Sequence, residues 1–249
     1  MAAFRPLNTR HSLRREWFLV MAEATAVIFA NGELGDPAIL RTRLRALRFD
    51  IVIAADGGAL HAAAVGLTVD RIVGDFDSLP LPARDDLARR GAALLQSPTG
   101  KDETDLELAL LDALQAGAKQ AVVLAAAGGR LDMTLANVGL LMHPALRGMT
   151  IQLWIGWDTA YLLLPPGGDI LGEVGDRVSL IPLGGEATGI TTHGLAFPLA
   201  AETLAVGPAR GVSNRVAQSA PRVDFASGAL LVVHSPDLEL PGSSKLPGS

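Results

Sequence analysis

Residues 51–66 read IVIAADGGALHAAAVG and contain one complete repeating unit of the fold. Ile51–Ala55 is a short apolar run typical of a buried strand, and an alanine-rich helical pattern over 58–65 follows it directly. The turn between them, Asp56-Gly57-Gly58, carries two glycines, which let the backbone approach other atoms closely. A strand that is apolar on both faces and leads at once into a helix indicates a parallel sheet covered by helices.

The same alternation extends from residue 25 to residue 155. Apolar runs that predict strands lie at 25–30, 51–55, 69–73, 92–95, 121–126 and 150–155. Helical patterns between them cover 37–48, 58–65, 83–90, 104–116 and 132–142. We therefore expect an α/β, Rossmann-like parallel-sheet domain over residues 24–156 that binds a nucleotide.

The chain changes character near residue 157. Short apolar runs separated by glycine and proline occur at 161–164, 177–182, 189–193, 203–206, 216–220 and 229–234. This pattern predicts a second, antiparallel β domain over residues 157–236. We interpret the arginine-rich residues 1–23 as a disordered extension and residues 237–249 as a flexible tail.

Composition narrows the classes of function. The 249 residues carry a net charge of −5, which argues against a nucleic-acid partner, and they include no cysteine for a disulfide, a thiolate zinc site or a nucleophile. The apolar runs are shorter than the roughly 18 residues of a membrane span. We expect a cytoplasmic protein without a membrane partner.

Two acidic segments stand out in this apolar chain. Gly74-Asp75-Phe76-Asp77-Ser78 follows a predicted strand, and Lys101-Asp102-Glu103-Thr104-Asp105 precedes a predicted helix. In extended backbone the carboxylates of Asp75 and Asp77 would point to the same side. Carboxylates at the carboxyl end of such a strand suit Mg²⁺, which fills its coordination with water and substrate phosphates. The candidate metal ligands are Asp75, Asp77, Asp102 and Asp105.

Each acidic segment also has a purely structural interpretation. An Asp-x-Asp sequence is common in polar turns, and Thr104 with Glu107 could form a helix-capping box beside Asp102 and Asp105. Two acidic loops at one end of a sheet repel each other, however, unless a cation lies between them. Taken together, the two segments favour the metal site.

Glycine-rich turns at strand ends extend the candidate site. Besides Gly57-Gly58, the segment Gly128-Gly129-Arg130-Leu131-Asp132 opens a helix after a predicted strand, and Asn31-Gly32 follows the first strand. Backbone N–H groups at a helix N-terminus bind phosphate, and Arg130 adds a cationic fork. The alternative is an ordinary strand-to-helix turn in each case.

These motifs, in their order and spacing, resemble the thiamine pyrophosphokinase (thiamine diphosphokinase) family over roughly residues 24–235. The resemblance rests on Asp56-Gly57-Gly58, Gly74–Ser78, Asp102-x-x-Asp105, Gly129-Arg130-x-Asp132, Ala136-Asn137, Gly194-Leu195 and Gly211-Val212-Ser213-Asn214. It implies a C-terminal antiparallel β-sandwich that binds thiamine, and a homodimer with active sites at the subunit interface. It also implies Mg²⁺-dependent transfer of the diphosphate of ATP to the hydroxyl of thiamine, releasing AMP.

The residues and the resemblance together give three sets of candidate site residues. We expect Asp56, Asp75, Asp77, Asp105 and Arg130 to be catalytic; Asn31, Gly57, Gly58, Lys101, Thr104, Gly128, Gly129 and Arg130 to bind ATP; and Asp132, Asn137, Ser213 and Asn214 to bind the acceptor. A general base is not assigned. Arg215-Val216 follow Ser213-Asn214, so this segment offers no aromatic ring to stack on thiamine.

Two other functions fit part of the pattern. An Asp-x-Asp motif on an α/β sheet also occurs in nucleotide-sugar glycosyltransferases, although these do not require the second acidic loop. A nucleotide-binding module without catalysis is the third interpretation. The products formed from ATP or a nucleotide sugar, with Mg²⁺ and thiamine, distinguish the three.

Overall fold

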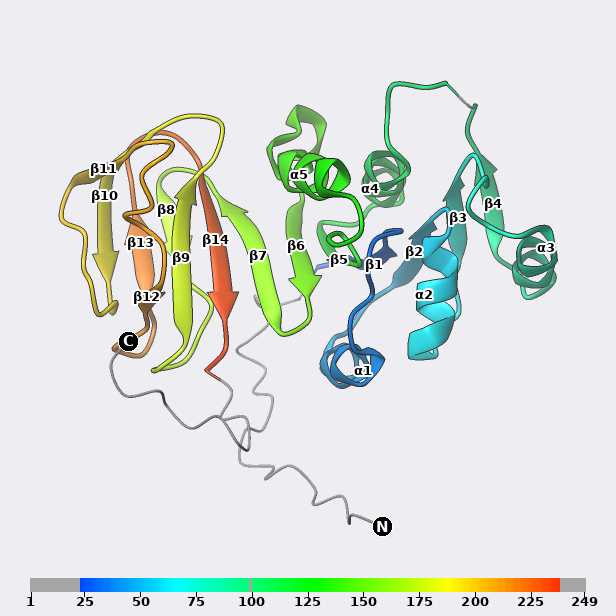
Figure 1. Ribbon diagram of the computed structural model, residues 1–249, viewed down its shortest axis with the longest axis horizontal. Coiled ribbons are helices and arrows are strands. Elements are labelled where there is room, and N and C mark those ends of the chain that lie inside the picture. Colours follow the sequence, from blue (N-terminus) through cyan, green and yellow to red (C-terminus); the bar gives the residue numbers. More distant parts are fainter. Residues whose placement is uncertain (1–22, 99, 238–249) are drawn as a thin grey trace, which may run out of the picture. The chain divides into compact units, whose positions relative to one another are not determined.

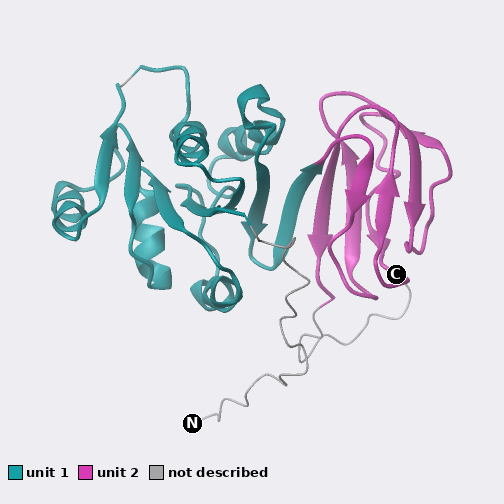
Figure 2. Cartoon of the chain, turned by 180° about the vertical axis from the view of Figure 1, so that it is seen from behind, with its two compact units in different colours: residues 1–162 teal, residues 163–249 magenta. Residues whose placement is uncertain are grey.

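The computed structural model describes residues 23–98 and 100–237. The predicted N-terminal extension and C-terminal tail lie outside the described residues, apart from Glu23 and Asp237. The chain divides into two compact units, residues 1–162 and residues 163–249 (Figure 2). No helix among the described residues combines the length and apolar character of a membrane span.

Seven neighbouring strands of a ten-stranded sheet begin in the first unit, in the order β7-β6-β5-β1-β2-β3-β4 (Figure 1). Its strands are β1 (Thr25–Phe29), β2 (Ile51–Ala55), β3 (Arg71–Gly74), β4 (Ala93–Gln96), β5 (Gln120–Leu124), β6 (Thr150–Ile155) and β7 (Asp158–Leu163). All neighbouring pairs are parallel except β6 and β7, which pair antiparallel. The predicted parallel α/β domain is confirmed, and the first unit extends through most of β7.

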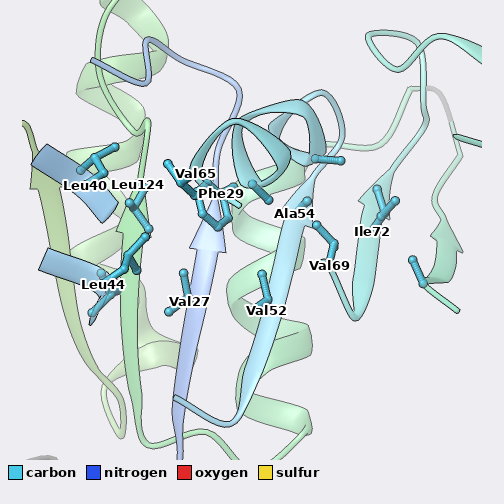
Figure 3. Packing of buried hydrophobic residues seen from close by; sticks show 14 of the residues in the cluster. Val27, Phe29, Leu40, Leu44, Val52, Ala54, Val65, Val69, Ile72 and Leu124 are labelled. Carbon is cyan, nitrogen blue, oxygen red and sulfur yellow. The ribbon is translucent and has the colours of Figure 1, made fainter. Parts of the chain in front are cut away.

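Helices cover the two faces of this sheet (Figure 1). They are α1 (Pro37–Ala46), α2 (Gly58–Val65), α3 (Leu81–Arg89), α4 (Asp105–Gln115) and α5 (Leu131–Gly139), with the 3-10 turns η2 (Leu140–Met142) and η3 (Pro144–Leu146). Alternate residues of β1 and β2, among them Val27, Phe29 and Val52, pack with residues of α1 and α2 in one buried cluster (Figure 3). Helix α4 contacts β1, β2 and β3.

The strand order places a topological switch point beside β1. This strand pairs with β2 on one side and with β5 on the other. The loops that leave β1 and β5 therefore diverge and open a crevice at the carboxyl ends of the strands, which is where open α/β sheets bind ligands.

The second unit is built from antiparallel pairs. Its strands are β8 (Gly167–Asp169), β9 (Arg177–Pro182), β10 (Ala187–His193), β11 (Glu202–Leu204), β12 (Asn214–Arg215), β13 (Arg222–Asp224) and β14 (Leu230–Ser235). They are ordered β12-β9-β14 in one sheet region and β11-β10-β13-β8 in a second sheet. The predicted antiparallel β domain is confirmed.

One predicted strand of this unit is wrong, and three short strands were not predicted. Residues 216–220 form no strand: Val216 makes an isolated bridge with Leu195, and Ala217 and Gln218 both donate their N–H groups to Gly194 O. The chain then turns at Ala220, which has a φ of 55°. The strands β8, β12 and β13 are absent from the sequence prediction, because strands of two or three mostly polar residues or glycines are too short to show apolar alternation.

A buried, hydrogen-bonded aspartate stabilises the second unit. Asp176 accepts hydrogen bonds from His234 Nε2 at 2.8 Å, Glu173 N at 2.8 Å and Asp237 N at 2.9 Å. Burial alone would raise the pKa of Asp176, but these hydrogen bonds outweigh it and hold the pKa below its ordinary value. The stability that Asp176 contributes is therefore present at neutral pH and is lost as the pH falls.

Replacing Asp176 with asparagine should lower the free energy of unfolding at pH 7 by about 2 kcal/mol, because hydrogen bonds to a charged acceptor are lost. The difference from the parent should shrink as the pH falls through about 3.9, the ordinary value for aspartate, towards the lower pKa of the folded state. Urea unfolding at several pH values measures both effects. Asp169→Asn, which removes an exposed carboxylate paired with Arg222, is the control and should cost less than about 1 kcal/mol. A loss at Asp176 that did not change with pH would contradict this account.

Candidate active site

A pocket of about 520 Å³ opens at the carboxyl ends of the strands in the first unit. It is lined by residues at or after the ends of β1, β2, β3 and β5, by the first turn of α4 and by the first two turns of α5. The polar lining residues include Asn31, Glu33, Asp56, Asp75, Asp77, Ser78, Asp105, Arg130, Thr134 and Asn137, with Gly32, Gly128 and Gly129 between them. The pocket thus coincides with the switch-point crevice.

Three aspartates converge in this pocket. Asp56, Asp75 and Asp77 can each offer a carboxylate oxygen, and these oxygens all lie within 4.8 Å of one another. Asp75 and Asp77 do not reach this position through extended backbone, as the sequence suggested, because Phe76 between them has a φ of 65° and is buried. The Phe76 side chain therefore lies in the core, and the two carboxylates remain at the pocket.

Asp56 is the buried member of the cluster. It is 2% exposed, its φ is 45°, and its Oδ2 accepts a hydrogen bond from Ser78 N at 3.0 Å. Burial raises the pKa of Asp56, the hydrogen bonds from Ser78 oppose this, and the charges of Asp105 and Asp77 raise the pKa further. Its Oδ1 is buried and has no hydrogen-bond partner among the described residues. A hard divalent cation would satisfy this oxygen and offset the repulsion, so the residues fit Mg²⁺.

Asp105 lies next to this cluster but is already paired. Lys101 Nζ donates to Asp105 Oδ1 and to Ser97 Oγ, the latter at 2.6 Å. Gly74 separates Asp105 from Asp56: a Cβ there would lie 3.2 Å from Asp105 Cγ and 3.0 Å from Asp56 Cβ. The absence of a side chain at Gly74 therefore lets the two carboxylates share one end of the pocket.

The rest of the second acidic loop lies outside the pocket lining. Asp102 is exposed, and neither Asp102 nor Lys101 lines the pocket. Thr104 caps α4, since its Oγ1 accepts the Glu107 N–H at 3.2 Å. The helix-capping role is therefore confirmed for Thr104. Asp105, in the first turn of the same helix, lies beside the candidate metal site.

The two glycine turns differ in their surroundings. A Cβ on Gly58 would lie 2.1 Å from Phe29 O, and one on Gly57 would lie 2.5 Å from Asn31 Oδ1, so these glycines let the start of α2 pack against the end of β1. They do not line the pocket, whereas Gly128 and Gly129 do. Gly129 N donates to Glu33 Oε1 at 3.0 Å, a contact that the sequence did not indicate.

Helix α5 contributes one wall. Arg130 and Asp132 form an exposed ion pair, with Nε donating to Oδ1 at 3.1 Å, which raises the pKa of Arg130 and lowers that of Asp132. Arg130 lines the pocket and Asp132 does not. Asn137 is 6% exposed, and its Nδ2 donates to Ala126 O at 2.8 Å. Its Oδ1 has no partner among the described residues, which leaves an acceptor in the pocket wall.

The second unit has a small cavity of about 80 Å³. It is lined by Leu180, Phe197, Pro198, Leu199, Arg210, Gly211 and Asn214. Asn214 Oδ1 accepts the Phe197 N–H at 3.0 Å, and Asn214 Nδ2 donates to Phe197 O at 2.7 Å. Phe197 is 68% exposed, which is unusual for an aromatic side chain. Ser213 has a φ of 62°, donates its N–H to Ser179 Oγ, and lies outside the lining.

Sequence reasoning did not single out Phe197. It lies in Gly194-Leu195-Ala196-Phe197-Pro198, two positions after the Gly194-Leu195 pair that carries part of the family resemblance. The signal was an aromatic residue in a glycine- and proline-bounded loop, but its pairing with Asn214, 17 positions away, is a tertiary contact.

Comparisons with known proteins identify the family. The family "Thiamin pyrophosphokinase, catalytic domain" matches residues 45–153, and "Thiamin pyrophosphokinase, vitamin B1 binding domain" matches residues 170–230. A thiamine pyrophosphokinase of Bacillus subtilis is 30% identical over 187 residues, covering 74% of this chain and 87% of the relative.

Solved structures agree with these matches. The crystal structure of the thiamine pyrophosphokinase from Bacillus subtilis superposes with a TM-score of 0.75 and 26% identity, covering 86% of this chain and all of that one. The enzyme from Geobacillus thermodenitrificans gives a TM-score of 0.71 and 26% identity, over 86% of this chain and 99% of its own. Because both family regions match in order along most of the chain, the chain belongs to the thiamin pyrophosphokinase family.

Proposed function

We propose that this chain transfers the diphosphate group of ATP to the hydroxyl of thiamine, giving thiamine diphosphate and AMP. The observation that carries the proposal is a single pocket that combines three convergent carboxylates with a glycine loop at a helix N-terminus. Such a pocket suits a polyphosphate with its metal ion. The family assignment supplies the identity of the two substrates.

We assign the metal to Asp56, Asp75 and Asp77. The buried, unpartnered Oδ1 of Asp56 supports this choice, since an ionised carboxylate in such a place requires a positive partner. Asp105 would act through its charge or through a bound water, because Lys101 already contacts it. Asp102 remains the weakest of the four ligands that the sequence suggested. When bound, Mg²⁺ would neutralise charge on the phosphates and hold them for in-line displacement.

We place the phosphates of ATP between the aspartates and the Gly128–Gly129 loop. Arg130 would contact a phosphate oxygen with its fork, and Asp132 would orient that fork through the ion pair described above. Asn137 Oδ1 would accept a hydrogen bond from a substrate donor. Asn31 lines the same pocket.

Other sequence candidates have positioning roles in this proposal. Gly57 and Gly58 hold the turn that carries Asp56, and Thr104 fixes the start of α4 before Asp105. Lys101 limits the repulsion between Asp105 and the other carboxylates. These residues would affect turnover through the geometry of the aspartates.

The reaction requires positioning more than covalent work by the protein. The hydroxyl oxygen of thiamine bonds to the β-phosphorus of ATP, the bond from that phosphorus to the bridging oxygen of AMP breaks, and the hydroxyl proton leaves to solvent or a nearby oxygen. A loose transition state needs little base assistance, so we assign no general base. The residues of the chain align the reacting groups, and the cationic side chains reduce the repulsion among the negative charges of the pocket and the phosphates.

For thiamine, we propose the cavity around Asn214 with Phe197 as its aromatic surface. A cationic aromatic ligand stacks favourably on an exposed phenyl ring. The hydrogen bonds between Asn214 and the backbone of Phe197 would fix the position of that ring. Ser213 supports the same segment through Ser179.

Phe197→Ala should raise the KM for thiamine by about tenfold, equivalent to about 1.4 kcal/mol, because a stacked aromatic contact is lost. The KM for ATP should stay within about twofold. Steady-state kinetics with each substrate varied separately provides the measurement. Phe197→Trp is the matched control and should retain the thiamine KM. An equal rise in the KM of both substrates would argue against a thiamine-specific role.

Incubation of the purified protein with ATP, thiamine and Mg²⁺ tests the proposed function directly. We expect AMP and thiamine diphosphate in equal amounts. In a parallel incubation with a nucleotide sugar in place of ATP, release of free sugar would instead indicate the glycosyltransferase alternative. Nucleotide binding without any product would indicate the non-catalytic module.

We also propose a homodimer whose active sites lie at the subunit interface. Helix α5 supports it, because Leu131 and Leu135 are 73% and 64% exposed and lie four residues apart on one stripe. A large exposed apolar stripe is typical of an interaction surface. Arg130 and Met133, which line the pocket, lie on the same segment.

A further inference from the structure

The carboxylate of Glu33 lies on the glycine loop at the start of α5. Glu33 N donates to Ala127 O at 2.8 Å, and Gly129 N donates to Glu33 Oε1 at 3.0 Å. A Cβ on Gly128 would lie 2.6 to 2.7 Å from the Cβ, Cγ and Cδ atoms of Glu33. The Glu33 side chain therefore packs against the loop, and hydrogen bonds fix the residue at both its backbone N–H and its carboxylate.

This carboxylate takes a loop amide that would otherwise face the pocket. Of the neighbouring amides, Gly128 N donates to Thr134 Oγ1 at 3.2 Å and Arg130 N donates to Gly128 O at 2.9 Å, so both are satisfied within the loop and helix. Gly129 N–H is instead paired with an anionic oxygen from another segment. A phosphate oxygen carries the same charge and seeks the same kind of donor.

The charge balance of the pocket gives this contact a consequence. Five carboxylates line it, those of Glu33, Asp56, Asp75, Asp77 and Asp105, and Arg130 is the one lysine or arginine among the described lining residues. Arg130 is already paired with Asp132. A cation at the aspartate cluster would offset the aspartates there, but Glu33 contacts the glycine loop and would still repel a polyphosphate at that loop.

We propose that the Glu33 carboxylate occupies the position of a phosphate oxygen on Gly129 N–H, and that ATP must displace it to bind. The inference rests on the proposed function, since it concerns the affinity of that pocket for its phosphate donor. Glu33 is then an affinity-determining residue: it weakens ATP binding and takes no part in the reaction once ATP is bound. With an internal competitor, the apparent association constant for ATP equals the intrinsic one multiplied by the fraction of sites that the competitor leaves free.

The test compares Glu33→Ala and Glu33→Gln with the parent. Titration calorimetry with ATP and Mg²⁺, without thiamine, should give a Kd about three- to tenfold lower for Glu33→Ala. Glu33→Gln should fall between the two, because glutamine removes the charge but keeps an acceptor for Gly129 N–H. In steady-state kinetics the KM for ATP should fall in parallel, with kcat and the KM for thiamine within about twofold.

Glu186→Gln makes the same charge change at an exposed position in the second unit and should leave ATP binding unchanged. Unchanged or weaker ATP binding in both Glu33 variants would overturn the inference, because Glu33 would then support the loop or contact the nucleotide. Thermal unfolding of each variant identifies a loss of folding, and Glu33→Gln retains the hydrogen bond if Glu33→Ala proves unstable. A parent that binds ATP but forms no thiamine diphosphate would refute the proposed function alone.

Discussion

Replacing Asp56 with asparagine should lower turnover by at least about 100-fold, which is about 2.7 kcal/mol of activation free energy. Asparagine is neutral and supplies a weaker metal ligand than a carboxylate, so the metal site would lose its buried member. The fold should survive, because asparagine tolerates a positive φ and its Oδ1 can still accept the Ser78 N–H. Steady-state assays at saturating ATP and thiamine measure the loss.

The same variant should be at least as stable as the parent when no divalent ion is present. Burial and the charges of Asp105 and Asp77 make an ionised Asp56 unfavourable, and asparagine removes that cost. Mg²⁺ should therefore raise the melting temperature of the parent and not that of Asp56→Asn. A variant that melts well below the parent yet retains turnover would show that Asp56 is structural.

Asp102→Asn distinguishes the two sets of metal ligands. The sequence alone placed Asp102 among the ligands, whereas the structure gathers Asp56, Asp75 and Asp77 and leaves Asp102 exposed. If the three-aspartate assignment holds, Asp102→Asn should change turnover by less than about threefold. A loss of turnover as large as that of Asp56→Asn would indicate that the second acidic loop supplies a metal ligand.

The α/β half of the fold was predictable because its strands are apolar on both faces and alternate with helices. The sequences of β1, β2 and β6 each show this signal within five or six consecutive residues, so these strands can be recognised without knowing their partners. The β half was less predictable. Strand β12 has two residues and β13 has three, so their positions depend on partners distant in the sequence.

The site was predictable in its residue types and less so in its grouping. Asp75 and Asp77 follow a strand, so their position at the sheet edge follows from sequence. That Asp56 joins them depends on the φ values of Asp56 and Phe76, which no local pattern in the sequence reveals. The contact of Glu33 with Gly129 and that of Phe197 with Asn214 likewise arise between separate loops.

Mixing two impaired variants should restore activity, assayed at thiamine well below the parental KM, if the proposed homodimer shares its sites between subunits. Asp77→Asn disables the phosphate pocket, and Asn214→Ala weakens the acceptor cavity by removing the contacts that hold Phe197. In a mixed dimer, one composite site would contain both lesions and the other would contain neither. Random exchange yields about half mixed dimers, each with one intact site of two, so about a quarter of parental activity is expected.

The control for this experiment is subunit exchange itself. Differently tagged variants, copurified after mixing, show that mixed dimers have formed. Each variant alone should stay at its own low turnover, and mixing two preparations of Asp77→Asn should restore nothing. If mixed dimers form and activity does not return, each chain builds its complete site from its own residues. The phosphate pocket and the acceptor cavity belong to different units of the chain. Return of activity would therefore mean that each phosphate pocket takes its acceptor residues from the partner subunit, and failure would mean that it takes them from its own chain.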